Sequence, residues 1–147
     1  MTQGTLRALE AMHGVLGVLA VGALLVPAVL TTARRGRFRV PIVIATLVAS
    51  FAGAVGLFLY PSYSRLLKRA IYTASRTHGV MFERKEHLAV AAIAFAWAGC
   101  LAYVSTPREP ESAASRAAFA RWCFVFSASI AIVVAVMGTM VASLRTF

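Results

Sequence analysis

The chain has 147 residues, of which 60% are hydrophobic, and its mean hydropathy is +0.78. Soluble domains average about 45–50% apolar residues, so this composition favours a membrane protein. Lys and Arg number 15 against 5 Asp and Glu. These basic residues border the apolar segments, where they meet lipid headgroups, so we expect no nucleic-acid partner. No zinc-type cysteine spacing, CxxCH motif or phosphate-loop motif is present.

Charge-free stretches cover residues 11–33, 40–64, 88–107 and 122–144. A helix rises 1.5 Å per residue, so about 20 residues cross the hydrocarbon core. A spanning backbone must satisfy its own hydrogen bonds, and the alternation of barrel strands is missing. The sequence therefore predicts an all-α, integral membrane four-helix up-down bundle forming a single domain over residues 1–147. The first stretch is longer than a usual signal-peptide core, so we expect it to remain as the first helix.

In chain order, the first helix is expected over residues 5–32, and the basic turn "ARRGRFR" leads to a second helix over 39–60. Pro61 is expected to end that helix. Basic and apolar residues then alternate at helical spacing over 65–72, which predicts a short amphipathic helix in the membrane interface. The third helix is expected over 82–104, and a polar loop, "STPREPESAAS", leads to the fourth over 116–144.

Orientation stays open. Side A of the bundle carries the N-terminus, the loop 61–85 and the C-terminus, and side B carries the turn 34–39 and the loop 105–115. Lys and Arg number 8 on side A and 7 on side B. The positive-inside rule needs an asymmetry, and these numbers give none.

Two histidines stand at matching places on side A. His13 and His87 begin the uncharged parts of the first and third helices, seven and nine residues from the midpoints near residues 20 and 96. The difference corresponds to about 3 Å of depth. Two imidazoles at one level on parallel helices can bind a metal from opposite sides, and in a membrane bundle the usual metal held in this way is haem iron. We therefore expect one b-type haem near side A with His13 and His87 as its axial ligands.

Further residues agree with a cofactor at this end. A flat macrocycle needs thin helix walls, and carboxylates one turn before each histidine suit a second shell that fixes the tautomer. Basic side chains at the surface suit two propionates. The expected walls are Gly14, Gly17, Gly53 and Gly56, the expected second shell is Glu10 and Glu83, and the expected propionate partners are Arg65, Arg69 and Lys85, with Arg7, Lys68 and Arg84 nearby.

The same residues have a simpler interpretation. Glycines in membrane helices often form close-packing surfaces, and interfacial histidines are often solvated. The alternative is therefore a cofactor-free scaffold or accessory subunit of a larger membrane complex, with a quinone pocket or another metal as further options. A di-iron site is excluded, because the expected second and fourth helices contain no Asp or Glu.

The remaining polar groups add no catalytic constellation. His78 is expected to be solvated in its loop, and Cys100 and Cys123 are expected to be isolated buried thiols. No Ser-His-Asp set or row of acidic groups across the bilayer is present. An electron carrier or quinone-linked redox subunit, with a redox or membrane partner or a second copy of itself, is therefore expected rather than a stand-alone catalyst.

"MFERKEHLAV" after "YPSYSRLLKRAIY", with an early "HG" and a final "MVASLRTF", resembles a group of small four-helix bacterial membrane proteins without assigned chemistry. The resemblance covers most of the chain and implies the bacterial inner membrane. In architecture the chain also looks like a minimal membrane cytochrome b. It departs from the common di-haem pattern of that class, because side B has no histidine, so the resemblance implies at most one such haem.

Overall fold

The computed structural model describes residues 3–30, 38–66, 68–105 and 110–143. Within these ranges the chain is helical and forms α1 (Gln3–Leu30), α2 (Arg39–Leu66), α3 (Lys68–Ala74), α4 (Arg76–Val104) and α5 (Pro110–Ala142). The basic turn and the middle of the polar loop lie outside the described residues. The predicted all-α class is confirmed.

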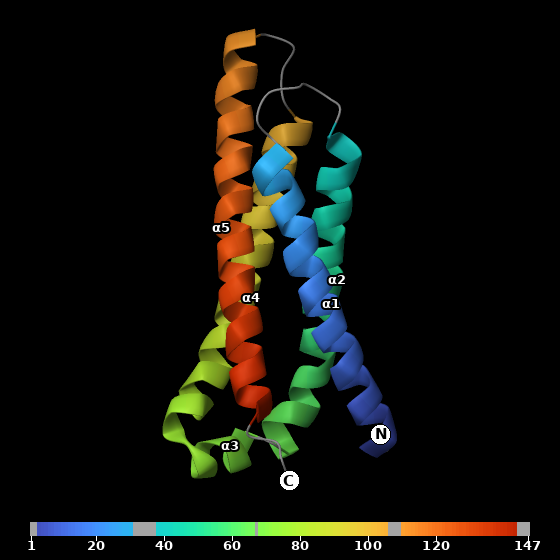
Figure 1. The fold of residues 1–147 in the computed structure, drawn as a ribbon, viewed down its shortest axis with the longest axis vertical. Helices are drawn as coiled ribbons and strands as arrows, with labels where there is room; N and C mark the ends of the chain where they lie inside the picture. Colours follow the sequence, from blue (N-terminus) through green and yellow to red (C-terminus); the bar gives the residue numbers. More distant parts are fainter. Residues whose placement is uncertain (1–2, 31–37, 67, 106–109, 144–147) are drawn as a thin grey trace.

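The four long helices run alternately up and down as a bundle (Figure 1). α1 packs beside α2 and α5, and α4 packs beside α5 and α2. α1 and α4 therefore occupy opposite corners. The short helix α3 lies across the lower end of the bundle in Figure 1, which is side A.

Four segments are long and apolar enough to cross a membrane: Ala8–Leu30, Arg39–Arg65, Arg76–Val104 and Ala113–Ala142. Large apolar side chains cover their outer surfaces. Val18, Leu57 and Val90, for example, are 69%, 73% and 68% exposed. Such exposure is unfavourable in water but suits contact with lipid tails, so the chain is an integral membrane protein.

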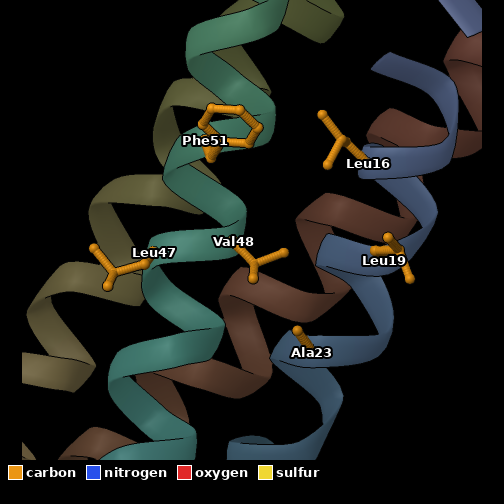
Figure 2. A pocket seen from close by; sticks show the side chains of 6 residues that line it. All are labelled: Leu16, Leu19, Ala23, Leu47, Val48 and Phe51. Carbon is orange, nitrogen blue, oxygen red and sulfur yellow. The ribbon is translucent and has the colours of Figure 1, made fainter. Parts of the chain in front are cut away.

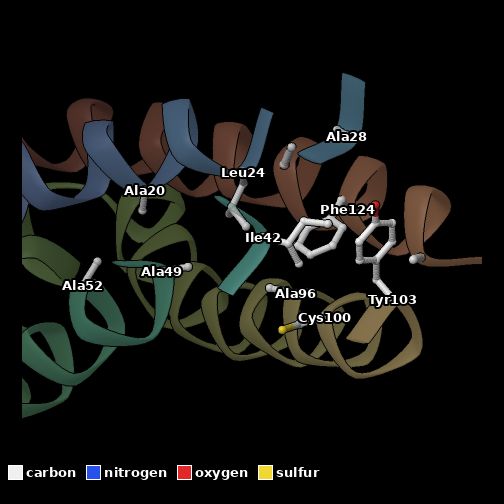
Figure 3. Packing of buried hydrophobic residues seen from close by; sticks show 12 residues of the cluster. Ala20, Leu24, Ala28, Ile42, Ala49, Ala52, Ala96, Cys100, Tyr103 and Phe124 are labelled. Atoms are coloured by element: carbon white, nitrogen blue, oxygen red, sulfur yellow. The ribbon is translucent and has the colours of Figure 1, made fainter. Parts of the chain in front are cut away.

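The main core fills the side B half of the bundle (Figure 3). Leu24 and Ile42 meet Phe124 there, with Ala96 and Cys100 on α4. The α4–α5 seam is close, because a Cβ at Gly99 would lie 3.0 Å from the Cβ of Cys123. Both cysteines are buried as free thiols.

Polar contacts between helices supplement this apolar core. The hydroxyl of Ser127 on α5 donates to the carbonyl of Ala92 on α4 over 2.7 Å. The indole N–H of Trp97 on α4 donates to Ser50 on α2 over 3.0 Å. These bonds join α4 to both of its neighbours near the middle of the membrane, where the side chains have no water to bond with.

A smaller second core closes side A. Ile71 of α3, Phe82 of α4 and Val141 of α5 are buried against one another, with Tyr63 and Met81 beside them. This packing docks α3 against the ends of the long helices. The predicted short helix between the second and third spans is therefore confirmed, as Lys68–Ala74.

Three expected boundaries were wrong, and one of them is the start of the fourth helix, which lies at Pro110 rather than residue 116. α2 does not end at Pro61 but continues to Leu66. Proline removes only the donor to the carbonyl of Leu57, and near the end of a span water or headgroups can bond that carbonyl instead. The third span begins at Arg76 rather than residue 82, because Ser75 is an N-cap whose hydroxyl accepts from the backbone N–H of His78 over 3.4 Å.

Candidate functional site

Between the two cores lies a layer of the bundle in which none of the described stretches of the long helices has a buried residue. Every residue over 8–19, 53–58, 83–91 and 129–140 is at least partly exposed, one stretch from each long helix. Buried residues flank these stretches, such as Ala20 on α1, and Phe82 and Ala92 on α4. Toward this end α1 and α4 also lean to opposite sides (Figure 1). We call this region the open layer.

Contacts between the helices show that these stretches lie side by side. Gly53 on α2 faces the side chain of Ile93, just beyond the α4 stretch, and Gly56 faces His13 on α1. Ser127, two residues before the α5 stretch, is bonded to Ala92. Small residues and partly exposed side chains from all four helices therefore lie at this level of the bundle.

His13 is a polar group on the inner side of this layer. Its ring lies against Gly56, where an added Cβ would be 2.8 Å from Cε1 and 3.4 Å from Nε2. No side chain larger than glycine leaves room for the ring in this position. The Nδ1 atom is buried and, within the described part of the chain, has no hydrogen-bond partner. The ring therefore carries one buried nitrogen with unused bonding capacity.

The other ring nitrogen has a partner. The backbone carbonyl of Ala52 interacts with the imidazole, and since Nδ1 is unbonded, Nε2 is the nitrogen that donates to it. With its proton on Nε2, the ring keeps a lone pair on Nδ1. Either nitrogen of a neutral imidazole can bind a metal, and a carbonyl bonded to the opposite nitrogen is the usual second-shell arrangement. The Ala52 carbonyl thus has the role expected of Glu10.

His87 lies elsewhere on the bundle. Its side chain is exposed, and its Nδ1 donates to the backbone carbonyl of Glu83 over 3.0 Å. The buried face of α4 runs through Phe82, Ala92 and Ala96, and His87 is five residues from Phe82, or about 140° around the helix. The structure therefore places His13 inside the bundle and His87 on its outer surface, and the described packing does not bring the two rings into one space.

The expected second-shell carboxylates are used differently. The carboxylate of Glu83 forms an ion pair with Lys68, with Nζ and Oε1 2.5 Å apart, so the backbone of Glu83 rather than its side chain holds the His87 ring. Glu10 is partly buried on α1.

The expected wall and propionate residues are only partly gathered. A Cβ added at Gly14 or Gly17 would meet nothing within 4 Å, so these positions leave space rather than form a contact. The Lys85 ammonium is near enough to act electrostatically on His13, and it also lies 5.0 Å from the centroid of the Phe82 ring. Arg65 and Arg69 are exposed on the side A surface. The structure thus brings together His13, Gly56 and Lys85.

One residue was missed by the sequence reasoning. Glu86 is partly buried and lies in the open layer, between Lys85 and His87, both of which act on its carboxyl group electrostatically. The sequence did contain a signal for this residue. Glu86 is four residues from Phe82 and three from Ala89, and this spacing places it on the inward stripe of α4.

The donor set decides which metal-containing group suits this site. Within the described residues, no three His, Cys, Asp or Glu side chains come together, whereas a bare metal ion needs about four protein ligands. Haem iron brings its own macrocycle and can be held by a single histidine. A single buried imidazole therefore suits haem better than a free ion.

A separate apolar groove lies on the outer side of the α1–α2 pair (Figure 2). It has a volume of about 470 Å³ and is lined by Leu16, Leu19, Ala23, Leu47, Val48 and Phe51. Leu19, Leu47 and Phe51 are among the exposed side chains of the bundle. With no ligating group in its walls, this groove is suited to hydrocarbon contact rather than to chemistry.

No protein-family model matches this chain, and comparison with curated proteins and with solved structures likewise gave no match.

Proposed function

We propose that this integral membrane protein binds one b-type haem in the open layer and works as an electron carrier or electron-transfer subunit. The observation that carries the proposal is the His13 ring, which lies inside the bundle against Gly56 with a buried, unbonded Nδ1. A buried imidazole nitrogen without a partner costs free energy unless something binds it. A ligand that accepts its lone pair removes that cost.

Four groups of this chain would hold the haem. His13 supplies the nitrogen ligand, and the Ala52 carbonyl fixes its tautomer from the opposite side of the ring. Gly56 provides the room that the ring needs. Lys85, near the ring and close to the side A end, is the cation best placed for a propionate. The bound haem would supply one-electron transfer, and the apolar helices around it would exclude water.

The proposal changes the ligand set that the sequence suggested. His87 is exposed and about 140° from the buried face of α4, so iron ligation within one bundle falls to His13. The His87 ring, held through Nδ1, keeps Nε2 available at the surface. In this account the partners expected from the sequence, a quinol or a second redox protein, meet the bundle from outside.

A cofactor-free accessory subunit is the second candidate, and one observation favours it. Gly14 and Gly22 are exposed on α1 and would meet nothing within 4 Å if they carried a Cβ. Another membrane protein could pack closely against such a surface. This candidate requires the open layer to be closed by that partner rather than by a cofactor.

Absorption spectra of purified protein, expressed with haem supplied, distinguish these functions. We expect a Soret band and sharp reduced α and β bands in the natural chain, lost in His13→Gly and restored when imidazole is added to that variant. His87→Ala and His78→Ala, matched controls for removal of an imidazole, should keep the bands. Imidazole rescue separates a missing ligand from a misfolded bundle.

Two results would overturn the proposal. A colourless natural chain would favour the accessory subunit. Loss of the bands in His87→Ala but not in His13→Gly would place the ligand on the outer surface. Loss in both variants would instead support ligation by the histidine pair, with α4 turned from the packing described here.

A further inference from the structure

The side A end carries a platform whose position is fixed by packing. Ile71 of α3 is 5% exposed and is enclosed by Phe82 and Val141. Lys68 at the start of α3 is paired with Glu83 on α4. The Tyr72 ring covers Gly79, where a Cβ would lie 2.6 Å from the ring carbons. Three separate contacts thus hold this short helix against the bundle.

Four arginines lie on α3 and on the two helices that contact it, and we name them the basic platform: Arg65 at the end of α2, Arg69 on α3, and Arg76 and Arg84 on α4. All are exposed. The ion pair of this region joins Lys68 to Glu83, and among the described residues none of the platform arginines forms an ion pair. Arg69 lies about 160° from the buried Ile71 around α3. The platform therefore presents uncompensated positive charge away from the core.

The depth of these arginines selects the partner. Arg65 is the last residue of the second span, and Arg76 is the first of the third, so both lie where hydrocarbon gives way to headgroups. A guanidinium group binds phosphate through two parallel hydrogen bonds, and a lysine at the same position does not. A soluble anion has no reason to be concentrated at this level, whereas phospholipid phosphates always are.

We propose that the basic platform is a binding site for anionic phospholipid headgroups, and that α3 is docked in order to hold its arginines at phosphate depth. The site is independent of any cofactor in the open layer. It adds to general headgroup attraction because the four arginines are carried by three helices whose backbones are held together by packing. We expect preference for a lipid that presents more than one phosphate, since several arginines can then be satisfied by one molecule.

Delipidated full-length protein in a neutral detergent, titrated with phosphatidylglycerol, cardiolipin or phosphatidylcholine and followed by native mass spectrometry, tests this site. We expect tightest retention of cardiolipin and weakest retention of phosphatidylcholine. Replacing one platform arginine by Gln should weaken anionic-lipid binding about fivefold, since a basic residue near an anionic surface contributes about 1 kcal/mol, which corresponds to that factor. Arg69→Lys should lose nearly as much as Arg69→Gln if bidentate binding matters.

Arg39→Gln with Arg121→Gln is the matched control, because both residues are exposed on side B and lie outside the platform. This variant should retain the lipids at side A. Equal binding of phosphatidylcholine and the anionic lipids, equal loss in the control, or full displacement by millimolar inorganic phosphate would each overturn the proposal. Each platform variant carries a single substitution, so the test does not depend on the folding of a chain that lacks all four arginines.

Discussion

The Cε1 atom of His13 lies 2.8 Å from the point that a Cβ at Gly56 would occupy, so ring and glycine fit together across the α1–α2 seam. The identity of one residue therefore determines the position of another in the candidate site. A glycine 43 positions away in the chain gives the imidazole its place inside the bundle. The ring in turn holds a buried Nδ1 that has no hydrogen-bond partner among the described residues.

Replacing Gly56 by Val should therefore displace the His13 ring. Added methyl groups in a packed seam cost about 1–3 kcal/mol unless the neighbour moves, and the tip of a histidine side chain can move. We expect the bundle to remain folded while the ratio of haem to protein falls well below that of the natural chain. Gly14→Val is the matched control, because a Cβ there meets nothing within 4 Å. Equal haem content in the two variants would contradict the position of the His13 ring against Gly56.

The docking of α3 should weaken at alkaline pH. The hydrogen bond to Glu83 raises the pKa of Lys68 above 10.5 and that of Tyr72 above 10.0. Both groups hold their proton more tightly in the folded protein, so their contribution is complete below those ordinary values and is lost as the pH rises through the higher folded values. On the alkaline side, the raised pKa values of Lys68 and Tyr72 therefore predict loosening of α3 above about pH 10.

A spin label on Ala74→Cys, in a chain with Cys100 and Cys123 replaced by Ala, measures this loosening, since residue 74 is exposed at the end of α3. Label mobility should stay constant from pH 7 to 9 and rise above 10. In Glu83→Gln the label should already be more mobile at pH 7. If label mobility rises below pH 9 in the chain that keeps both Lys68 and Glu83, other groups control the docking of α3.

The α4–α5 seam should be intolerant of side chains at Gly99. An added Cβ would lie 3.0 Å from the Cβ of Cys123 and 3.1 Å from the backbone oxygen of Ala120. Backbone cannot move aside without separating the helices. We expect Gly99→Val to lower the free energy of unfolding by about 1–3 kcal/mol, measured by denaturation in mixed micelles. Gly22→Val, at an open surface position, should change it by less than half of that amount.

The spans were predictable because the membrane imposes them. Charge-free length predicted the four crossings, and the structure confirms them. The ends were less predictable, because they depend on local chemistry rather than on hydropathy. Ser75 begins the third span six residues before the apolar pattern does, and Pro61 fails to end α2 because its missing hydrogen bond falls where polar partners are available.

The candidate site was half predictable for a different reason. Position along a helix gives the depth of a side chain, and His13 and His87 have similar depths by that measure. Direction around the helix requires the phase of the buried stripe. Ala20 and Leu24 are seven and eleven residues from His13, which places that ring inward, whereas His87 is out of phase with Phe82, Ala92 and Ala96. The direction of the buried stripe on the third span could have been read from the sequence, because small residues recur there at helical spacing.

The free Nδ1 of His13 could not be predicted. It depends on Ala52 and Gly56, and on the absence of a polar side chain opposite the ring among the described residues. Such a detail follows from the angle at which α1 crosses α2. That angle is set by packing across the whole seam rather than by any short motif.

Titration of purified, haem-free protein with haemin, followed at the Soret band, tests the central claim most directly. The account predicts saturation at one equivalent in the natural chain and in His87→Ala, and no specific saturation in His13→Gly until imidazole is added. A natural chain that binds haemin no better than His13→Gly would contradict the assignment of the open layer as a haem site.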